Sequence, residues 1–360
     1  MLKYTLITLL LSSLIISAQI PTEYYDSAKN LSAEDLKHEL NQIIDNHTEF
    51  YYTSSATDVW DILKDTDKDP NNSDNVILIY SGISVNGAQE YNSANGWTRV
   101  HIWAKSRGNF GTSIGVGTDV HALRPLDNTT NIKRNNRSFN NCTSCEDVID
   151  KWGNTTGSKK DTNDWTFEPR DEVKGDVARM IFYMAVRYEG LDNYANLELT
   201  ETVLPQGDKQ PLHGVLSTLL EWNRNDPVDA WEKNRNDIIY YSYQNNRNPF
   251  IDFPELAEHI WGTEMGVNWI GEESLNISTN NKNNISLSIY PNPAFDILNL
   301  KGLYLSAKVN IYDAIGRKVF VSEINVNNNT VDVSGLRGVY IVNIVTQERT
   351  TTKRIMINKQ

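Results

Sequence analysis

Residues 97–140 hold the side chains of this sequence that are best suited to catalysis. From Arg99 to Arg137 the chain carries seven basic residues and two acidic ones, a local formal charge of +5. Two of the six histidines, His101 and His121, lie in the same stretch. Cations attract phosphates, and a neutral imidazole can take a proton near pH 7. The stretch therefore indicates a site for a polyanion, although composition alone also allows a solvated basic loop.

The charge of the whole chain points away from nucleic acid. Its 360 residues include 34 Lys and Arg but 46 Asp and Glu, which gives a formal net charge of −12. A typical nucleic-acid-binding domain is basic. The total is an average over unlike parts, however, since acidic segments such as 65–74 offset the basic stretch. An acidic exterior favours solubility outside the cell and limits unproductive sticking to DNA.

Residues 1–18 have the pattern of a secretory signal peptide. Lys3 precedes an apolar stretch from Leu6 to Ile16, and the small residues Ser17 and Ala18 form a cleavage site. The apolar stretch is shorter than the roughly 20 residues of a membrane helix, and the rest of the chain has no apolar run of that length. We expect an exported protein with no membrane span after the signal peptide is removed.

The chain has only two cysteines, Cys142 and Cys145. Two are too few for a zinc site of the four-cysteine kind. The surrounding sequence, NNCTSCEDV, is typical of a loop, whereas a thioredoxin-like redox pair needs a strand followed by a helix. Because an exported protein can form disulfides, we predict a local disulfide, with a redox pair as the alternative.

Length and patterning predict two domains of different class, in the fold class α+β. Helical patterns dominate residues 19–263, which predicts a mainly helical domain with a buried strand at 76–80. Residues 264–286 are polar and rich in Asn, which is typical of a linker. From 287 to 360 apolar residues alternate in short runs between turn signals, which predicts a small β-sandwich.

Helical spacing of apolar residues places the helices of the first domain. The segment 177–188 is apolar on all sides, which predicts a central buried helix. Asp226 is expected to cap the helix that follows it. The helices are expected at 32–47, 57–64, 177–188, 216–222 and 227–243.

The C-terminal domain resembles the type A sorting domain of the type IX secretion system. The segments that carry the resemblance are YPNPAFDILNL at 290–300, YDAIGRKVF at 312–320 and GVYIVNI at 338–344. The resemblance implies recognition by the type IX secretion machinery of a Bacteroidetes-type bacterium, after export through the inner membrane. A secreted or cell-surface protein is therefore expected.

The first domain resembles the bacterial endonuclease I family. RVHIWAKS at 99–106, DVHALRP at 119–125 and NIKRNN at 131–136 carry the resemblance in the basic stretch. Further matches lie at 168–190, 219–237 and 246–262. The resemblance implies an exported, nonspecific nuclease with a ββα-metal motif. Such a nuclease hydrolyses phosphodiester bonds in DNA, and often in RNA, with a divalent cation, which we take to be Mg²⁺.

The resemblance also implies roles for single residues. His101 falls at the general base that activates the attacking water, and Asn131 at the asparagine that ligates the metal from the motif's helix. Asp127 would cap that helix. Asp119 and His121 match positions that orient the site, and Asp119 is a further candidate metal ligand. One activated water and one hard, oxygen-ligated cation meet the chemical needs of phosphodiester hydrolysis.

Several cations of the basic stretch are candidates for contact with substrate. Arg124 and Arg134 match family positions and are expected to contact the reacting phosphate. The alternative for both is a salt bridge that frames the site. Further phosphate contacts are expected from Arg99, Lys105, Arg107 and Lys133.

The sequence departs from the family pattern beside the general base. The family has a metal-ligating glutamate directly before the histidine, where this chain has Val100. Smaller departures are Thr98, Ala104 and Ala122. Valine cannot bind a cation, so reduced metal affinity is expected. The leading hypothesis is an exported, metal-dependent endonuclease. The alternatives are a catalytically impaired nucleic-acid-binding protein and, from the sorting tail, a surface adhesin.

Overall fold

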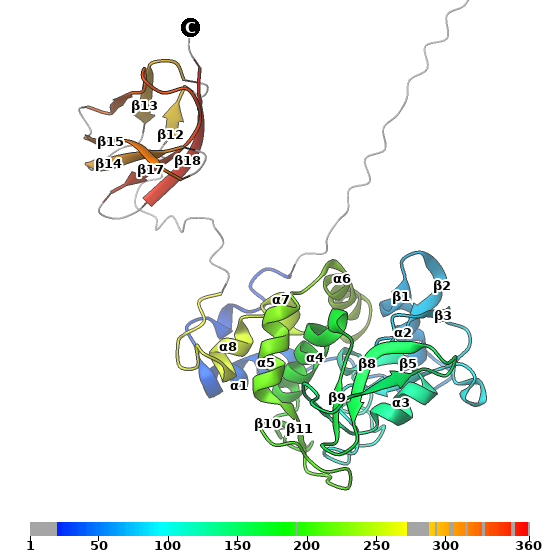
Figure 1. The fold of residues 1–360 in the computed structure, drawn as a ribbon. Helices are drawn as coiled ribbons and strands as arrows, with labels where there is room; N and C mark the ends of the chain where they lie inside the picture. Colours follow the sequence, from blue (N-terminus) through cyan, green and yellow to red (C-terminus); the bar gives the residue numbers. More distant parts are fainter. Residues whose placement is uncertain are drawn as a thin grey trace, which may run out of the picture. The chain divides into compact units, whose positions relative to one another are not determined.

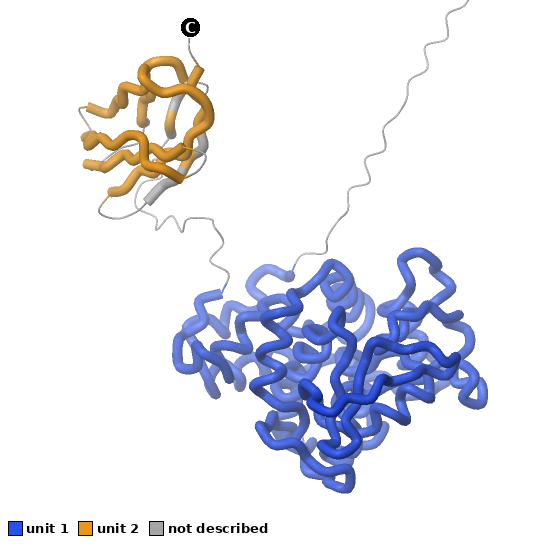
Figure 2. The backbone as a smooth tube through the Cα atoms, viewed as in Figure 1, with its two compact units in different colours: residues 1–272 blue, residues 273–360 orange. Residues whose placement is uncertain are grey.

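The computed structural model describes residues 20–271 except 192, and 288–358 except 292–293, 302–305, 314–315, 326–327 and 347–349. The chain divides into two compact units, residues 1–272 and 273–360, which Figure 2 shows in separate colours. The predicted signal peptide and most of the predicted linker lie outside the described residues. None of the described helices is long and apolar enough to cross a membrane.

The central helix of the first unit is α4 (Lys174–Arg187), as its apolar composition predicted. All of its residues after Lys174 are buried. It packs against α1 (Ala33–Ile44), α5 (Leu216–Asn225) and α7 (Pro249–Asp252), and α8 (Leu256–Trp261) packs on α1 and α5 (Figure 1). Short 3₁₀ turns lie at Asp26–Ala28, Asn92–Ala94 and Asp171–Val173.

Helix positions agree with the sequence better than helix ends do. The helices predicted at 32–47 and 57–64 are α1 and α2 (Val59–Thr66). The segment predicted as one helix over 227–243 is α6 (Ala230–Ile238) followed by a π-helical stretch, Ile239–Gln244.

The cap of α6 was predicted wrongly. Asp229, not Asp226, is the capping residue, and its side chain accepts the backbone N–H groups of Trp231 and Glu232. The Glu232 side chain in turn accepts from the Asp229 backbone, which completes a capping box. The Asp226 carboxylate instead accepts the Gly175 N–H at 2.8 Å, so it meets the beginning of α4.

A β-hairpin followed by a helix positions the candidate site. β4 (Trp97–His101) pairs antiparallel with β5 (Leu123–Asp127), and α3 (Asn128–Arg134) begins directly after β5. A long loop and a 3₁₀ turn, Val120–Ala122, join the two strands. The predicted strand at 76–80 is displaced: β2 spans Asn72–Ile77 and pairs with β1 (Lys68–Asp69) and β3 (Ser84–Asn86).

Other small sheets complete the first unit, so helices and strands are mixed there and a mainly helical character is not confirmed. A four-stranded sheet has the order β6-β9-β8-β7 and lies after α3 in the chain. Its strands are β6 (Ser138–Phe139), β7 (Glu146–Ile149), β8 (Thr155–Asp161) and β9 (Thr166–Glu168). β10 (Glu198–Thr200) and β11 (Leu212–Val215) form a parallel pair.

The described residues of the second unit form strands in two sheets. One sheet has the order β12-β13-β16 and the other β15-β14-β17-β18. Apolar residues of both sheets, such as Leu298, Val309 and Val342, share one core. The strands are β12 (Ser288–Tyr290), β13 (Ile297–Lys301), β14 (Ala307–Tyr312), β15 (Lys318–Ile324), β16 (Thr330–Asp332), β17 (Gly338–Val345) and β18 (Thr350–Ile357).

Candidate active site

Helix α3 connects the end of β5 to the end of β4, which lie at opposite ends of the hairpin. His101 is the last residue of β4, and Asp127 caps α3 by accepting the Thr130 N–H at 3.0 Å. At the other end of α3, the Arg134 guanidinium donates to the carbonyl of Ile102, the residue after His101. Asn131 lies half-buried on α3 between these two anchors. The C-terminal half of α3 is thereby fixed against the end of β4.

His101 is held as a neutral imidazole with a defined tautomer. Its side chain is 8% exposed, and Nε2 lies 2.9 Å from the Gly117 carbonyl oxygen. A carbonyl can only accept, so Nε2 carries the hydrogen and Nδ1 keeps its lone pair. Within the described part of the chain, Nδ1 has no hydrogen-bond partner. The Tyr52 ring lies nearly parallel to the imidazole, with centroids 5.7 Å apart.

Burial and nearby cations keep His101 unprotonated. Burial, assisted by the nearby cations Lys105, Arg134 and Arg99, lowers the pKa of His101 to about 3, against the opposing effect of the Gly117 carbonyl. At neutral pH the imidazole is therefore uncharged and can accept a proton. This is the state that a general base needs.

Asp119 anchors the loop that presents the Gly117 carbonyl. Its Oδ2 accepts from the hydroxyls of Tyr183 at 2.7 Å and Tyr188 at 2.9 Å. Its Oδ1 accepts from the Gln244 amide at 3.1 Å and the His121 backbone at 3.0 Å. Both carboxylate oxygens are thus already engaged with protein donors. This network fixes Asp119, which lies two residues after Gly117 in the chain.

His121 lies in the same buried network. Its Nε2 is 3.1 Å from the Asn246 carbonyl oxygen, to which it donates. Burial lowers the pKa of His121 to about 4, although Asp119 opposes the shift. A third histidine, His213, is also buried, and burial with the nearby Arg134 and Arg107 lowers its pKa well below the usual range.

The buried histidines predict a loss of stability in acid. The unfolded chain binds protons at these histidines below about pH 6.5, while folded His121 stays neutral down to about pH 4. Stability is therefore full above pH 6.5 and falls as the pH drops. We expect the His121→Asn variant to reduce the slope of unfolding free energy between pH 6 and 5 by about 1.4 kcal/mol per pH unit. Urea unfolding at several pH values measures this slope, and equal slopes for parent and variant would contradict the buried neutral state.

Arg124 lies inside a buried ion-pair network. Its Nε is 2.5 Å from Asp67 Oδ1, and its Nη1 is 3.4 Å from Asp176 Oδ2. Asp67 also pairs with Arg235 at 3.3 Å, and the guanidinium of Arg124 lies 4.4 Å from the centre of a Trp231 ring. These contacts match the framing role that was the alternative for Arg124.

Arg134 is buried without an acidic partner among the described residues. Besides the Ile102 carbonyl, it donates to the Asn135 carbonyl at 2.9 Å and to His213 Nε2 at 3.1 Å. Its Nε has no hydrogen-bond partner in the described structure. The positive charge of Arg134 is therefore not neutralised by a described carboxylate, and burial lowers the pKa of its guanidinium.

The remaining predicted phosphate contacts differ in exposure. Lys105 is exposed, on the loop that follows His101. Arg107 is fully buried and donates to the carbonyls of Asn136, Leu204 and Pro205. Arg99 is buried against Tyr52, with 3.5 Å from its guanidinium carbon to the ring centre. Lys133 is half-buried and donates to a backbone carbonyl at 2.6 Å.

Comparison of the sequence with known proteins identifies the family of the first unit. The family model described as "Endonuclease I" matches residues 32–255. The chain belongs to the endonuclease I family. An extracellular ribonuclease of Bacillus amyloliquefaciens is 49% identical over 251 residues, which cover 69% of this chain and 82% of that protein. The extracellular ribonuclease of Bacillus subtilis strain 168 is 48% identical over 238 residues, 66% of this chain and 78% of that protein.

The second unit matches a different family model. Residues 288–358 match the "Secretion system C-terminal sorting domain". The chain is therefore an endonuclease I domain followed by a secretion sorting domain. Relatives described as nucleases do not favour the alternative of a binding protein without activity.

The residues at the motif do not form a site for a tightly held divalent cation, although the endonuclease I family is generally metal-dependent. Val100 is 1% exposed and belongs to the apolar core. Asn131 offers one neutral oxygen, and the charged side chains that most affect His101 are cations. In the described structure, the one group of three His, Cys, Asp or Glu side chains close enough to share an ion is Cys142, Cys145 and Glu168.

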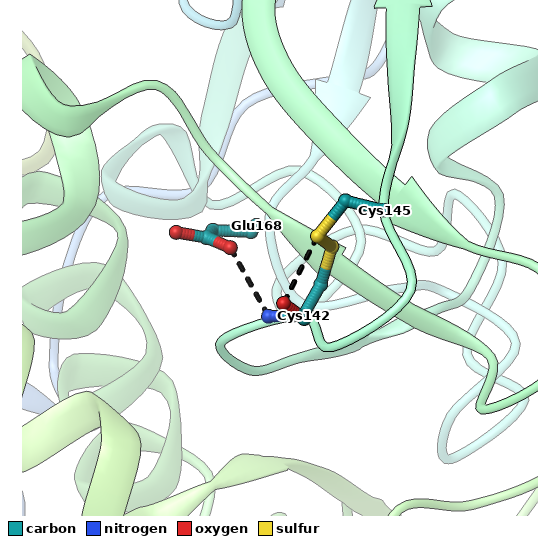
Figure 3. Close-up of side chains that lie close together, drawn as sticks. All are labelled: Cys142, Cys145 and Glu168. Atoms are coloured by element: carbon teal, nitrogen blue, oxygen red, sulfur yellow. Dashed lines mark hydrogen bonds between the residues drawn. A yellow bond between two sulfur atoms is a disulfide. The ribbon is translucent and has the colours of Figure 1, made fainter.

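That group is a disulfide and a neighbouring carboxylate (Figure 3). Cys142 and Cys145 are joined by a disulfide, so their sulfurs are not free to bind an ion. Glu168 accepts the Cys142 N–H at 3.0 Å and pairs with Lys174 at 2.6 Å. These contacts fix the loop between β6 and β7 against β9.

Sequence reasoning missed three residues around the site. His213 and Tyr80 lie next to Arg134, and Trp165 contacts Asn136 just beyond α3. None has a motif of its own, and each is distant in sequence from the residue it contacts. The tertiary fold alone reveals these contacts.

Proposed function

We propose that the protein is an exported endonuclease that hydrolyses phosphodiester bonds in DNA and RNA, with His101 as general base. The observation that carries the proposal is the fixed neutral tautomer of His101, whose Nδ1 lone pair is left without a protein partner at the end of β4. Membership of the endonuclease I family supports the reaction class. The two relatives described as extracellular ribonucleases support RNA as a substrate beside DNA.

The proposed reaction is attack of water on phosphorus. His101 Nδ1 takes a proton from the water as the new P–O bond forms, and the bond to the leaving oxygen of the strand breaks. The Nε2–H bond to the Gly117 carbonyl holds the ring in place and stabilises the imidazolium that results. Lys105 is exposed on the next loop and is the cation we propose to meet the phosphate.

We propose that Mg²⁺ arrives with the substrate and is held weakly by the protein. Mg²⁺ keeps several of its waters and is often bound through substrate phosphates. Asn131 would supply one amide oxygen. The chemistry that such an ion supplies is neutralisation of charge on the phosphoryl oxygens.

Adding a carboxylate beside His101 is expected to tighten Mg²⁺ binding. We expect the Val100→Glu variant to reach half-maximal plasmid nicking at an Mg²⁺ concentration lower by at least about tenfold, since ligand charge sets affinity for hard cations. The matched control is Val100→Gln, which has the same size but no charge. Equal Mg²⁺ requirements for all three chains would show that the ion does not lie next to residue 100.

We also propose that the second unit directs secretion through the type IX system of a Bacteroidetes-type bacterium. Its match to a secretion sorting domain supports a sorting role. The direct test of the enzyme itself is nicking of supercoiled plasmid and cleavage of single-stranded RNA by the purified chain, with and without Mg²⁺. Cleavage of neither substrate would refute the proposed function.

A further inference from the structure

A cavity of about 620 Å³ lies next to the disulfide loop of the first unit. Its walls come from residues on both sides of Cys142, from 162–166 before and within β9, and from 203–206. Pockets that bind small organic groups usually measure about 300–1,000 Å³. The volume is therefore sufficient for a nucleobase with its sugar.

The lining favours a neutral polar ligand over a phosphate. Most of the lining side chains are amides and hydroxyls, among them Asn140, Asn141 and Gln206. The lining includes one charged residue, the acidic Asp164, and no lysine or arginine. Amides donate and accept hydrogen bonds at once, as the edges of nucleobases do. Trp165 adds an aromatic surface to the same lining.

One buried polar atom of the lining is left unsatisfied. The side chain of Thr166 is 2% exposed, and its Oγ1 has no hydrogen-bond partner in the described structure. A buried hydroxyl without a partner costs free energy. Thr166 is thus a residue of the lining whose hydroxyl has an unused donor and acceptor.

Trp165 is held in a fixed position at the cavity. Its backbone has a φ of 56°, in the left-handed region, and its Nε1–H donates to Asn136 Oδ1 at 2.9 Å. The Arg137 guanidinium carbon lies 3.9 Å from the ring centre and covers one face. The other face of the ring can stack with a base.

Asn136 connects the cavity to the loop that follows His101. Its Nδ2 donates to Ser106 Oγ at 3.2 Å and to the Gln206 carbonyl at 2.9 Å. The Asn136 carbonyl in turn accepts from Arg107, on the same loop as Ser106. These bonds join the wall of the cavity to the loop that begins directly after His101.

We propose that this cavity binds an unpaired nucleobase of the substrate strand, stacked on Trp165 and hydrogen-bonded to Thr166. The inference rests on the proposed nuclease function and adds a base-binding site to it. A base in a duplex is stacked and paired, so it must leave the helix to enter the cavity. The protein therefore binds single strands in preference to duplexes.

Binding of short oligonucleotides to the full chain tests the proposal without relying on cleavage. The probes are a fluorescein-labelled single-stranded d(AC)₆ and a 12-mer of the same charge with no bases, measured by anisotropy in EDTA. The oligonucleotide is recovered and sized afterwards to show that it is intact. Stacking of one base on an aromatic side chain changes affinity by about 5- to 150-fold. We expect the parent to prefer d(AC)₆ by a factor in this range, and Trp165→Ala to lose the preference.

Three further variants keep the test decisive. Trp165→Phe keeps an aromatic ring and is expected to retain most of the preference, while Thr166→Val is expected to lose part of it with little change of shape. Trp152→Ala is the matched control, since Trp152 is 48% exposed at the opposite end of the β7–β8 hairpin. A parent that binds both probes equally, or a folded Trp165→Ala chain that keeps the preference, would overturn the proposal. A chain that shows the preference but cuts no nucleic acid would refute the nuclease function and leave the base site intact.

Discussion

The His101→Ala variant is expected to lower kcat for plasmid nicking by about 100- to 10,000-fold, the usual contribution of a positioned general base. The imidazole is buried, neutral and fixed by the Gly117 carbonyl, and the substitution removes its Nδ1 from the end of β4. Initial rates at saturating plasmid measure the effect. Binding of oligonucleotides should change little, because the alanine removes no cation.

A surface histidine gives the matched control for this experiment. His38 lies on α1, and its side chain is 50% exposed and pairs with Glu189 at 2.8 Å. The His38→Ala variant should nick plasmid at the parental rate. If His101→Ala retains the parental rate too, His101 is not the base and the proposed mechanism fails.

The Arg124→Met variant is expected to lose about 3–5 kcal/mol of unfolding free energy, the usual result of removing one partner of a buried ion pair. The substitution leaves the buried Asp176 with a longer and weaker ion pair, because the guanidinium of Arg179 lies 3.9 Å away. Asp67 would keep its ion pair with Arg235 and the hydrogen bond that it accepts from Thr66. Urea unfolding followed by circular dichroism measures the loss.

An exposed ion pair provides the comparison. Arg224 is 46% exposed and contacts Glu258 at 2.7 Å. Arg224→Met should cost no more than about 1 kcal/mol, because solvent screens exposed pairs. Equal losses for the two variants would show that Arg124 does not act through a buried network. If the Arg124→Met variant keeps the parental stability but loses most of its activity, Arg124 instead contacts the reacting phosphate.

The order of residues predicted the family and its hairpin–helix motif better than their charge did. RVH at 99–101 and NIKR at 131–134 are short patterns that depend on local spacing, so they could be recognised without a structure. The structure joins them as β4 and α3 of one hairpin–helix motif. The sorting domain was recognised for the same reason, from three short segments that its family model covers.

Counting charges could not reveal which cations are exposed. The basic stretch has a local charge of +5, yet Arg99, Arg107, Arg124 and Arg134 are all buried. The partners that bury them are distant in sequence: Asp67 lies 57 residues before Arg124. Only tertiary packing brings such partners together, so composition overstated the positive surface.

Short strands and the choice of helix cap also could not be predicted from the sequence. β6, β9 and β1 have only two or three residues each, too few for a hydrophobic period to show. At α6, both Asp226 and Asp229 are good capping residues, and the choice depends on Glu232 reaching back to Asp229. The Asp226 carboxylate instead accepts the backbone N–H of Gly175, in the first turn of α4 and 51 residues earlier in the chain.

The most direct test of the central claim is chemical rescue of a His101→Gly variant by free imidazole. The variant leaves room where the buried ring stood, and added imidazole can take the proton from water in its place. We predict that plasmid nicking by the variant is at least about 100-fold slower than by the parent. The rate should rise in proportion to the concentration of neutral imidazole, while the parent is unaffected. A His101→Gly chain that is folded and nicks plasmid at the parental rate, or one that imidazole does not accelerate, would contradict His101 as the general base.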